Sequence, residues 1–220
     1  MSLPSLSAIA PLSYALILAA YLLGSLSGSL LLGRLRGVDI RQQGSGNAGG
    51  TNAFRTQGWR FALGVVAIDI GKGALATWLA LRYAPVGTGL SVTAHGYVAA
   101  LAAVIGHVWP LWHGFRGGKG AATAVGGLLV LWPFCLPLLL AVWLLVLVIT
   151  GYVGLATVIT AICLPLLAWI LEAGAQRQWF ALAAALLIVF THRGNLQRLR
   201  AGTESRFARA RLLHRLRGRS

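Results

Sequence analysis

Long apolar runs separated by short polar segments dominate this chain. Residues 12–32, 91–105, 121–149 and 153–171 contain no Asp, Glu, Lys or Arg. A helix rises about 1.5 Å per residue, so about 20 apolar residues cross a bilayer. No segment alternates with the period of a barrel strand. The pattern therefore predicts an all-α fold, a polytopic bundle of transmembrane helices.

Basic residues gather in three polar segments. The first holds Arg34, Arg36, Arg41, Arg55 and Arg60, the second holds Arg116 and Lys119, and the third holds nine arginines between residues 193 and 219. The connections around residues 84–90 and 174–176 carry almost none. Because cytoplasmic loops of membrane proteins collect Arg and Lys, all three basic segments are expected on the cytoplasmic side.

Because all three basic segments are expected on the same side, the number of membrane crossings between them must be even. The runs predict helices over residues 11–33, 60–82 and 91–107. Reading 121–149 as one helix gives six crossings and leaves the C-terminal arginines outside, whereas a break at Pro133 and Pro137 gives seven. We therefore expect about seven helices, with the N-terminus outside and the C-terminus cytoplasmic. No basic residue precedes the first run, so we expect a retained helix rather than a signal peptide.

Composition supports a membrane protein with one domain. Hydrophobic residues make up 57% of the chain and charged residues 10%, against about 25% in a soluble domain. A single transmembrane domain is expected over residues 1–200, followed by a basic tail, 201–220. The tail sequence "FARARLLHRLRGRS" predicts an amphipathic helix on the membrane surface. The net charge of +15 favours anionic lipid headgroups over nucleic acid as partner. Cys135 and Cys163 lie in apolar runs, so neither a disulfide framework nor a metal site is expected.

Two glycine clusters carry candidate chemistry. "GSGNAGGTNAFR" (44–55) begins with the G-x-G-x-x-G spacing of a dinucleotide-binding turn, but no buried strand precedes it. "GFRGGKGAAT" (114–123) is similar to a P-loop, but Gly120 occupies the position of the Mg²⁺-binding Ser or Thr. Both clusters present glycine backbone beside a cation, which suits a phosphate at a helix N-terminus.

A third polar segment, "THRGNLQRLRAGTE" (191–204), is expected on the same face. Together the three segments predict a cationic, amide-rich pocket for one or two phosphates, beside an apolar bundle suited to an acyl chain. The polar candidates are Ser45, Asn47, Thr51, Asn52, Arg55, His107, Lys119, His192, Arg193, Asn195 and Arg198.

Carboxylates are scarce, which limits the possible mechanisms. Only Asp69 and Glu204 are expected near the pocket, so paired carboxylates and a Ser-His-Asp triad are excluded. Soluble-type glycerolipid acyltransferases use an H-x-x-x-x-D motif, and none of the histidines here has Asp five residues later. Asp69 and Lys72 lie three residues apart on one face of a predicted helix. Two roles fit such a pair inside the membrane: a functional one, or a structural one in which the two charges neutralise each other. Catalysis is therefore expected to depend on positioning and electrostatic stabilisation.

The three segments together resemble the PlsY family, the bacterial acyl-phosphate:glycerol-3-phosphate acyltransferases. "GSGNAGGTNAFR", "GHVWPLWHGFRGGKGAAT" and "HRGNLQRLRAGTE" are similar to its three motifs, in order and spacing, and "DIGKG" (69–73) is also typical of it. One departure is "YVGLAT", in which Gly154 and Thr157 stand where the family tends to carry serines. The resemblance implies a seven-helix enzyme of the bacterial plasma (inner) membrane with its active site facing the cytoplasm.

The resemblance also implies a reaction. A fatty acyl group passes from acyl phosphate to the 1-hydroxyl of sn-glycerol 3-phosphate, giving lysophosphatidic acid and phosphate, with no metal or cofactor. Combining it with the residues, we expect four catalytic residues: Ser45, Lys119, His192 and Asn195. The expected substrate-binding residues are Asn47, Thr51, Asn52, Arg55, His107, Gly117, Gly118, Gly120 and Arg193. The alternatives are a transporter of a phosphorylated metabolite, a non-catalytic lipid-binding subunit, and an acyl-CoA-dependent enzyme of the same fold.

Overall fold

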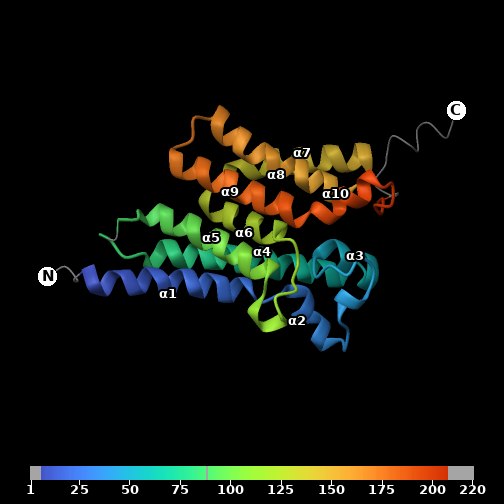
Figure 1. Ribbon diagram of the computed structural model, residues 1–220, viewed down its shortest axis with the longest axis horizontal. Coiled ribbons are helices and arrows are strands. Elements are labelled where there is room, and N and C mark those ends of the chain that lie inside the picture. Colours follow the sequence, from blue (N-terminus) through green and yellow to red (C-terminus); the bar gives the residue numbers. More distant parts are fainter. Residues whose placement is uncertain (1–5, 88, 208–220) are drawn as a thin grey trace. The chain divides into compact units, whose positions relative to one another are not determined.

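The computed structural model describes residues 6–87 and 89–207, with side chains from residue 11 onward. Over these residues the protein is all-helical, as predicted, and contains no strand (Figure 1). The chain divides into two compact units between Pro133 and Phe134. The single-domain assignment of residues 1–200 stays a prediction.

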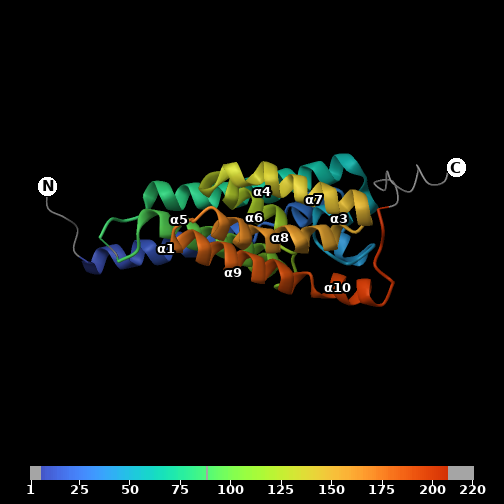
Figure 2. The same cartoon turned by 90° about the horizontal axis from the view of Figure 1, so that it is seen from above.

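The first unit begins with a long helix and ends with a short one. Its elements are α1 (Leu6–Gly24), α2 (Gly28–Leu35), η1 (Ile40–Gln42), α3 (Gly50–Gln57), α4 (Trp59–Tyr83), α5 (Val92–Val108), η2 (Leu111–His113) and α6 (Ala121–Leu131). α1, α4, α5 and α6 pack side by side, and α3 packs on α4 (Figures 1 and 2). The predicted helices over 60–82 and 91–107 are confirmed by α4 and α5.

Small residues allow this close packing. A Cβ at Gly24 would overlap the backbone of Ala103 in α5, and a Cβ at Gly126 would overlap that of Ile70 in α4. Close approach through small residues is a usual way for membrane helices to associate. These contacts hold α4, α5 and α6 in one bundle. The helix ends that we expect on the cytoplasmic side therefore lie at the same end of this bundle.

The predicted single helix over 11–33 is wrong, because the chain breaks between α1 and α2. The two helices are bent by 48° across this break. The Ser25 hydroxyl donates to the Tyr21 carbonyl at 2.9 Å, beside the helical bond from the Ser25 N–H, and such a bond one turn back often bends a helix. The break thus lies in the small, polar stretch "GSLSGS".

The predicted break at the two prolines is confirmed. η3 (Pro133–Cys135) separates α6 from α7 (Leu136–Thr150), with Pro137 in the first turn of α7. The second unit continues with α8 (Val153–Ile170), α9 (Ala175–Thr191) and α10 (Arg193–Arg200). α7 packs on α8 and α8 on α9.

Several helices are long and apolar enough to cross a membrane. There are four among the described residues, or up to six if each bent pair, α1–α2 and α9–α10, is one span. The shorter apolar helix α6 has 11 residues. The count of seven stays a prediction. The amphipathic helix expected at the C-terminus falls on residues 207–220, of which 208–220 lie outside the described residues.

Candidate functional site

The first glycine loop, residues 43–49, is held from inside by Asn52. This side chain is 1% exposed. Its Nδ2 donates to the carbonyls of Ile40 (2.9 Å) and Gln43 (3.0 Å), and its Oδ1 accepts from the Ser45 N–H at 2.9 Å. Since both ends of the amide are bonded to the loop, Asn52 shapes the loop rather than reaching a ligand, contrary to the binding role expected for it.

Hydrogen bonds within this loop reduce the number of its backbone N–H groups that could bind an anion. The N–H groups of Ser45 and Gly46 are used within the loop, the second by the Gln43 carbonyl at 3.0 Å. The Ser45 side chain is exposed and that of Asn47 is half-buried. Thr51 is half-buried and Arg55 exposed in α3, four residues apart and so on one face of this helix.

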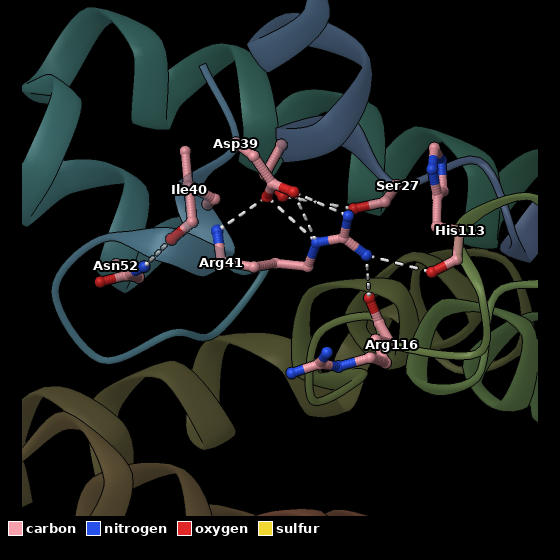
Figure 3. Close-up of polar contacts among 8 residues, drawn as sticks. Ser27, Asp39, Ile40, Arg41, Asn52, His113 and Arg116 are labelled. Carbon is pink, nitrogen blue, oxygen red and sulfur yellow. Dashed lines mark hydrogen bonds and ion pairs between the residues drawn. The ribbon is translucent and has the colours of Figure 1, made fainter.

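Arg41, which the sequence marks only as one of the basic residues of the first polar segment, joins the first two polar segments (Figure 3). Arg41 pairs with Asp39 through Nε (3.0 and 3.1 Å) and Nη2 (2.7 Å). Its Nη1 donates to the carbonyls of His113 (3.0 Å) and Arg116 (3.2 Å). Arg41 therefore clamps the turn that leads into the second glycine loop. The only signal in the sequence is the Asp-x-Arg spacing.

The clamp also shifts the titration of its two members. The hydrogen bonds from Arg41 hold the pKa of the Asp39 carboxyl below its usual range. The same bonds raise the pKa of the Arg41 guanidinium. Both groups are therefore charged at neutral pH, as a fork-shaped guanidinium–carboxylate pair requires.

The second glycine loop packs on the end of α5. Gly117 N–H donates to the Val108 carbonyl and Gly118 N–H to the His107 carbonyl, each at 3.1 Å. These bonds satisfy carbonyls that the end of α5 leaves open. The N–H groups of Gly117 and Gly118 are therefore not available to a phosphate, which corrects the role expected for these two glycines.

Gly118 is the point at which the two glycine loops meet. A Cβ at this position would overlap His107 Nε2 and lie 2.8 Å from the Ala48 carbonyl oxygen of the first loop. The requirement for glycine is thus close packing of protein on protein. Gly120 has a different requirement, because its φ of +86° lies in the left-handed region, where it caps α6.

Lys119 stands between these two glycines, directly before α6. Its side chain is half-buried. The first N–H groups of a helix are left open by the helix itself, and the macrodipole adds positive potential there. A lysine directly before the N-terminus of an 11-residue helix is the combination that suits an anion, and the role expected for Lys119 stays a prediction.

His107 lies in the last turn of α5 and is 3% exposed. It belongs to a buried polar cluster with Asp69 and Lys72 of α4. The Lys72 Nζ lies 2.8 Å from His107 Nδ1 and 2.9 Å from Asp69 Oδ1. His107 connects this cluster to the junction of the two glycine loops, because its Nε2 is the atom that a Cβ at Gly118 would overlap.

The third polar segment lies in the second unit. His192 is 5% exposed, and its Nδ1 lies 2.8 Å from the Ile188 carbonyl oxygen. A carbonyl only accepts, so Nδ1 carries the proton and Nε2 of the neutral ring is an acceptor. Arg193, the first residue of α10, folds back on the end of α9, with Nη1 donating to the Phe190 carbonyl at 3.0 Å and its guanidinium 4.3 Å from the Phe190 ring centroid.

Asn195 is positioned by a carboxylate that we did not assign to the site. Its Nδ2 donates to Glu204 Oε1 at 2.6 Å, and Arg198 Nε donates to Glu204 Oε2 at 2.7 Å. A Cβ at Gly154 would lie 2.8 Å from Asn195 Cβ. Gly154 thus leaves room for the Asn195 side chain to pack. The Thr157 hydroxyl donates to the Val153 carbonyl and accepts from Trp143 Nε1, so it serves the fold.

Comparison with known proteins covers nearly the whole chain. A family model described as "Glycerol-3-phosphate acyltransferase" matches residues 14–202. A protein of that description from Chlorobaculum parvum is 38% identical over 220 residues, covering 87% of this chain and 95% of its own. One from Shewanella woodyi is 40% identical over 205 residues, covering 91% and 96%.

Two solved structures share the fold. The crystal structure of PlsY (YgiH), an integral membrane glycerol 3-phosphate acyltransferase, in its glycerol 3-phosphate form has a TM-score of 0.81 and 33% identity, covering 89% of this chain and 95% of that one. The lysophosphatidic acid form has a TM-score of 0.79 and 32% identity, covering 88% and 94%.

Proposed function

Because the chain belongs to the PlsY-type family of glycerol-3-phosphate acyltransferases, a family of integral membrane enzymes, we propose how its own residues acylate glycerol 3-phosphate. The donor in this proposal is a fatty acyl phosphate. The acceptor atom is the 1-hydroxyl oxygen, and the products are 1-acyl-sn-glycerol 3-phosphate and inorganic phosphate. The glycerol 3-phosphate and lysophosphatidic acid forms of the related PlsY support this acceptor and this product.

The observation that carries the proposal is the contact of the two glycine loops at Gly118. Asn47 precedes Ala48, and Lys119 follows Gly118, so one expected binding residue and one expected catalytic residue flank this contact. Lys119 and the N-terminus of α6 bind a phosphate there, and Arg55 and Thr51 of α3 add charge and a hydroxyl. Ser45 and Asn47 bind the second phosphate from the first loop.

The chemistry needs little from the protein beyond charge and orientation. The 1-hydroxyl oxygen attacks the carbonyl carbon of the acyl phosphate, and the bond from that carbon to the phosphate oxygen breaks. The hydroxyl proton passes to an oxygen of the phosphate group, and this group leaves as hydrogen phosphate. Matched positive charge lowers the barrier because it stabilises the leaving phosphate.

His192 and Asn195 orient the acceptor hydroxyl. The Nε2 lone pair of His192 accepts a hydrogen bond from this hydroxyl, and the amide of Asn195 is held for the same task by Glu204. Because the phosphate takes the proton, His192 assists the reaction but is not indispensable to it.

The proposed topology follows from the basic segments. α1–α2, α4, α5, α6, α7, α8 and α9–α10 are seven crossings, with the N-terminus outside and all three polar segments facing the cytoplasm of a bacterium. Cysteine-accessibility labelling tests this arrangement. A cysteine at Gly87 labelled only from outside supports it, and one labelled only from inside contradicts it.

The reaction is tested with purified protein in lipid mesophase. Palmitoyl phosphate and glycerol 3-phosphate are supplied without magnesium, and inorganic phosphate release is followed. Release that requires both substrates and is lost in Lys119→Ala supports the proposal. Turnover with palmitoyl-CoA but not with palmitoyl phosphate would overturn the donor while leaving the acceptor.

A further inference from the structure

A buried ion pair closes the break between α1 and α2. This break leaves backbone groups without helical partners inside the bundle, where an open group is costly. Lys72 Nζ donates to the Leu26 carbonyl at 2.9 Å, and the Gly28 N–H donates to Asp69 Oδ1 at 3.1 Å. The pair thus satisfies one acceptor and one donor that the break exposes.

The same lysine determines the tautomer of His107. An ammonium group has three N–H donors and no acceptor. Lys72 Nζ has three acceptors within reach, which are Asp69 Oδ1 (2.9 Å), the Leu26 carbonyl (2.9 Å) and His107 Nδ1 (2.8 Å). With all three bonds made, Nδ1 is an acceptor, so the ring proton is on Nε2.

Charge balance favours the same assignment. Asp69 and Lys72 neutralise each other, and their side chains are 2% and 5% exposed. A protonated His107 would add a second cation 2.8 Å from the ammonium in this buried cluster. Buried charges are tolerated only when they are paired and hydrogen-bonded, so a neutral ring completes the cluster.

The Nε2–H of His107 faces the junction of the two glycine loops. A Cβ on Gly118 would overlap Nε2, and Lys119 is the next residue. Among the described residues, Nε2 has no hydrogen-bond partner. A donor of this kind, on a side chain that is 3% exposed and beside a lysine and a helix N-terminus, is matched by an anion at the junction.

We propose that Asp69 and Lys72 are positioning residues of the acyltransferase: Lys72 holds His107 in the tautomer whose Nε2–H donates to the glycerol 3-phosphate phosphate beside Lys119. This inference rests on the proposed phosphate site. It assigns the intramembrane pair two linked tasks, closing the α1–α2 break and fixing the direction of a substrate-binding hydrogen bond.

The tautomer is tested without any kinetic measurement. Two-bond ¹H–¹⁵N correlation spectra of the ¹⁵N-labelled protein distinguish protonated Nδ1 from protonated Nε2 in each of the five histidines, and His107→Asn identifies the signal of His107. We expect protonation at Nε2 for His107 and at Nδ1 for His192. A His107 ring protonated at Nδ1, or at both nitrogens, at neutral pH would overturn the proposal.

The coupling is tested with a double-mutant cycle. Asn at 107 keeps an acceptor near the Nδ1 position but removes the Nε2 donor, whereas Gln keeps an amide near Nε2. A hydrogen bond to a charged group is strong, so we expect His107→Asn to raise KM for glycerol 3-phosphate about tenfold or more with kcat little changed, and His107→Gln to recover most of the loss. Lys72→Met should raise the same KM but add nothing in the His107→Asn background.

Control variants separate this role from simple destabilisation. Thr77→Val removes a buried hydroxyl from the same helix, one that donates only to Gly73 of its own α4, and should leave both constants unchanged. If Lys72→Met does not fold, Asp69→Asn/Lys72→Met removes both charges and the donor together. Additive effects on KM would overturn the inference while wild-type turnover upholds the proposed function; an inactive wild type would overturn the function itself.

Discussion

Two buried histidines of this enzyme, His107 and His192, are held in opposite tautomers. In the first unit, His107 Nδ1 accepts from Lys72, so Nε2 is a donor. In the second unit, His192 Nδ1 donates to the Ile188 carbonyl, so Nε2 is an acceptor. The difference arises entirely from the partner of Nδ1, an ammonium in one case and a carbonyl in the other. A donor suits a phosphate and an acceptor suits a hydroxyl, which is the division of tasks that we propose for them.

The largest effect is expected at Gly118, where the first unit has no space to adjust. In Gly118→Ala the new Cβ meets both His107 and the Ala48 carbonyl, so the two glycine loops must move apart. Displacements of about 1 Å can cost about a hundredfold in rate, and we expect at least that loss in kcat/KM. Steady-state phosphate release measures it.

Gly71→Ala is the matched control for this variant. Gly71 is an exposed glycine inside α4, and a Cβ there meets no atom within 4 Å. Removing a glycine from a helix stabilises it by about 0.5–1 kcal/mol, so this protein should be active and slightly more stable. Equal activity in the two variants would show that the junction at Gly118 is not critical.

This junction marks how far the sequence could predict the site. The two glycine loops were expected to meet because both follow apolar runs on the same predicted face, and uncharged runs also predicted α5 and α8. The hydrogen bonds of Gly117, Gly118 and Asn52 to backbone carbonyls were not predictable. A bond to a backbone group leaves no periodic pattern and no charge pairing in the sequence.

The break between α1 and α2 was missed for a related reason. Apolar composition continues through it, since only Ser25, Ser27 and Ser29 interrupt the run and serine is common in membrane helices. The pair that closes the break, Asp69 and Lys72, lies more than 40 residues away. The sequence left this pair open between a functional and a structural role, and only the fold reveals what it contacts.

A smaller effect is expected at His192, which tests the other half of the comparison. A positioned general base contributes about 10²–10⁴-fold to a rate. In the proposed mechanism the phosphate receives the proton, so we expect His192→Gln to lower kcat by less, about tenfold to a hundredfold. Turnover and separate binding measurements for both substrates provide the test. Complete loss of turnover with both substrates still bound would make His192 the essential base.

Stability rather than rate should report on Glu204. This carboxylate is 6% exposed and bonds both Asn195 and Arg198, and Arg198 is 42% exposed. Glu204→Ala should cost about 1–2 kcal/mol, the lower part of the range for a charged hydrogen bond, because water can reach Arg198. Glu204→Gln keeps the acceptor for Asn195 and should lose less. Thermal unfolding of both variants decides, and an equal loss in the two would assign the effect to Arg198 alone.

The smallest effect is expected at the Asp39–Arg41 clamp, where both side chains are about 30% exposed. The pKa of Asp39 is lowered in the folded protein, so its contribution to stability is complete above the usual carboxyl pKa of about 3.9 and is lost as the pH falls through the lower, folded value. The contribution should be below about 1 kcal/mol. Asp39→Asn should therefore lower Tm slightly at pH 7 and differ less from the wild type near pH 3.

Arg41→Lys separates the ion pair from the clamp itself. Lysine keeps the charge but cannot pair with the carboxylate and reach the His113 and Arg116 carbonyls with one rigid fork. If the clamp orders the turn before Gly117, this variant should raise KM for glycerol 3-phosphate more than Asp39→Asn does, although its Tm changes no more. Equal KM values in the two variants would mean that the surface pair only stabilises the first unit, and that the direction of the His107 donor depends on the buried pair alone.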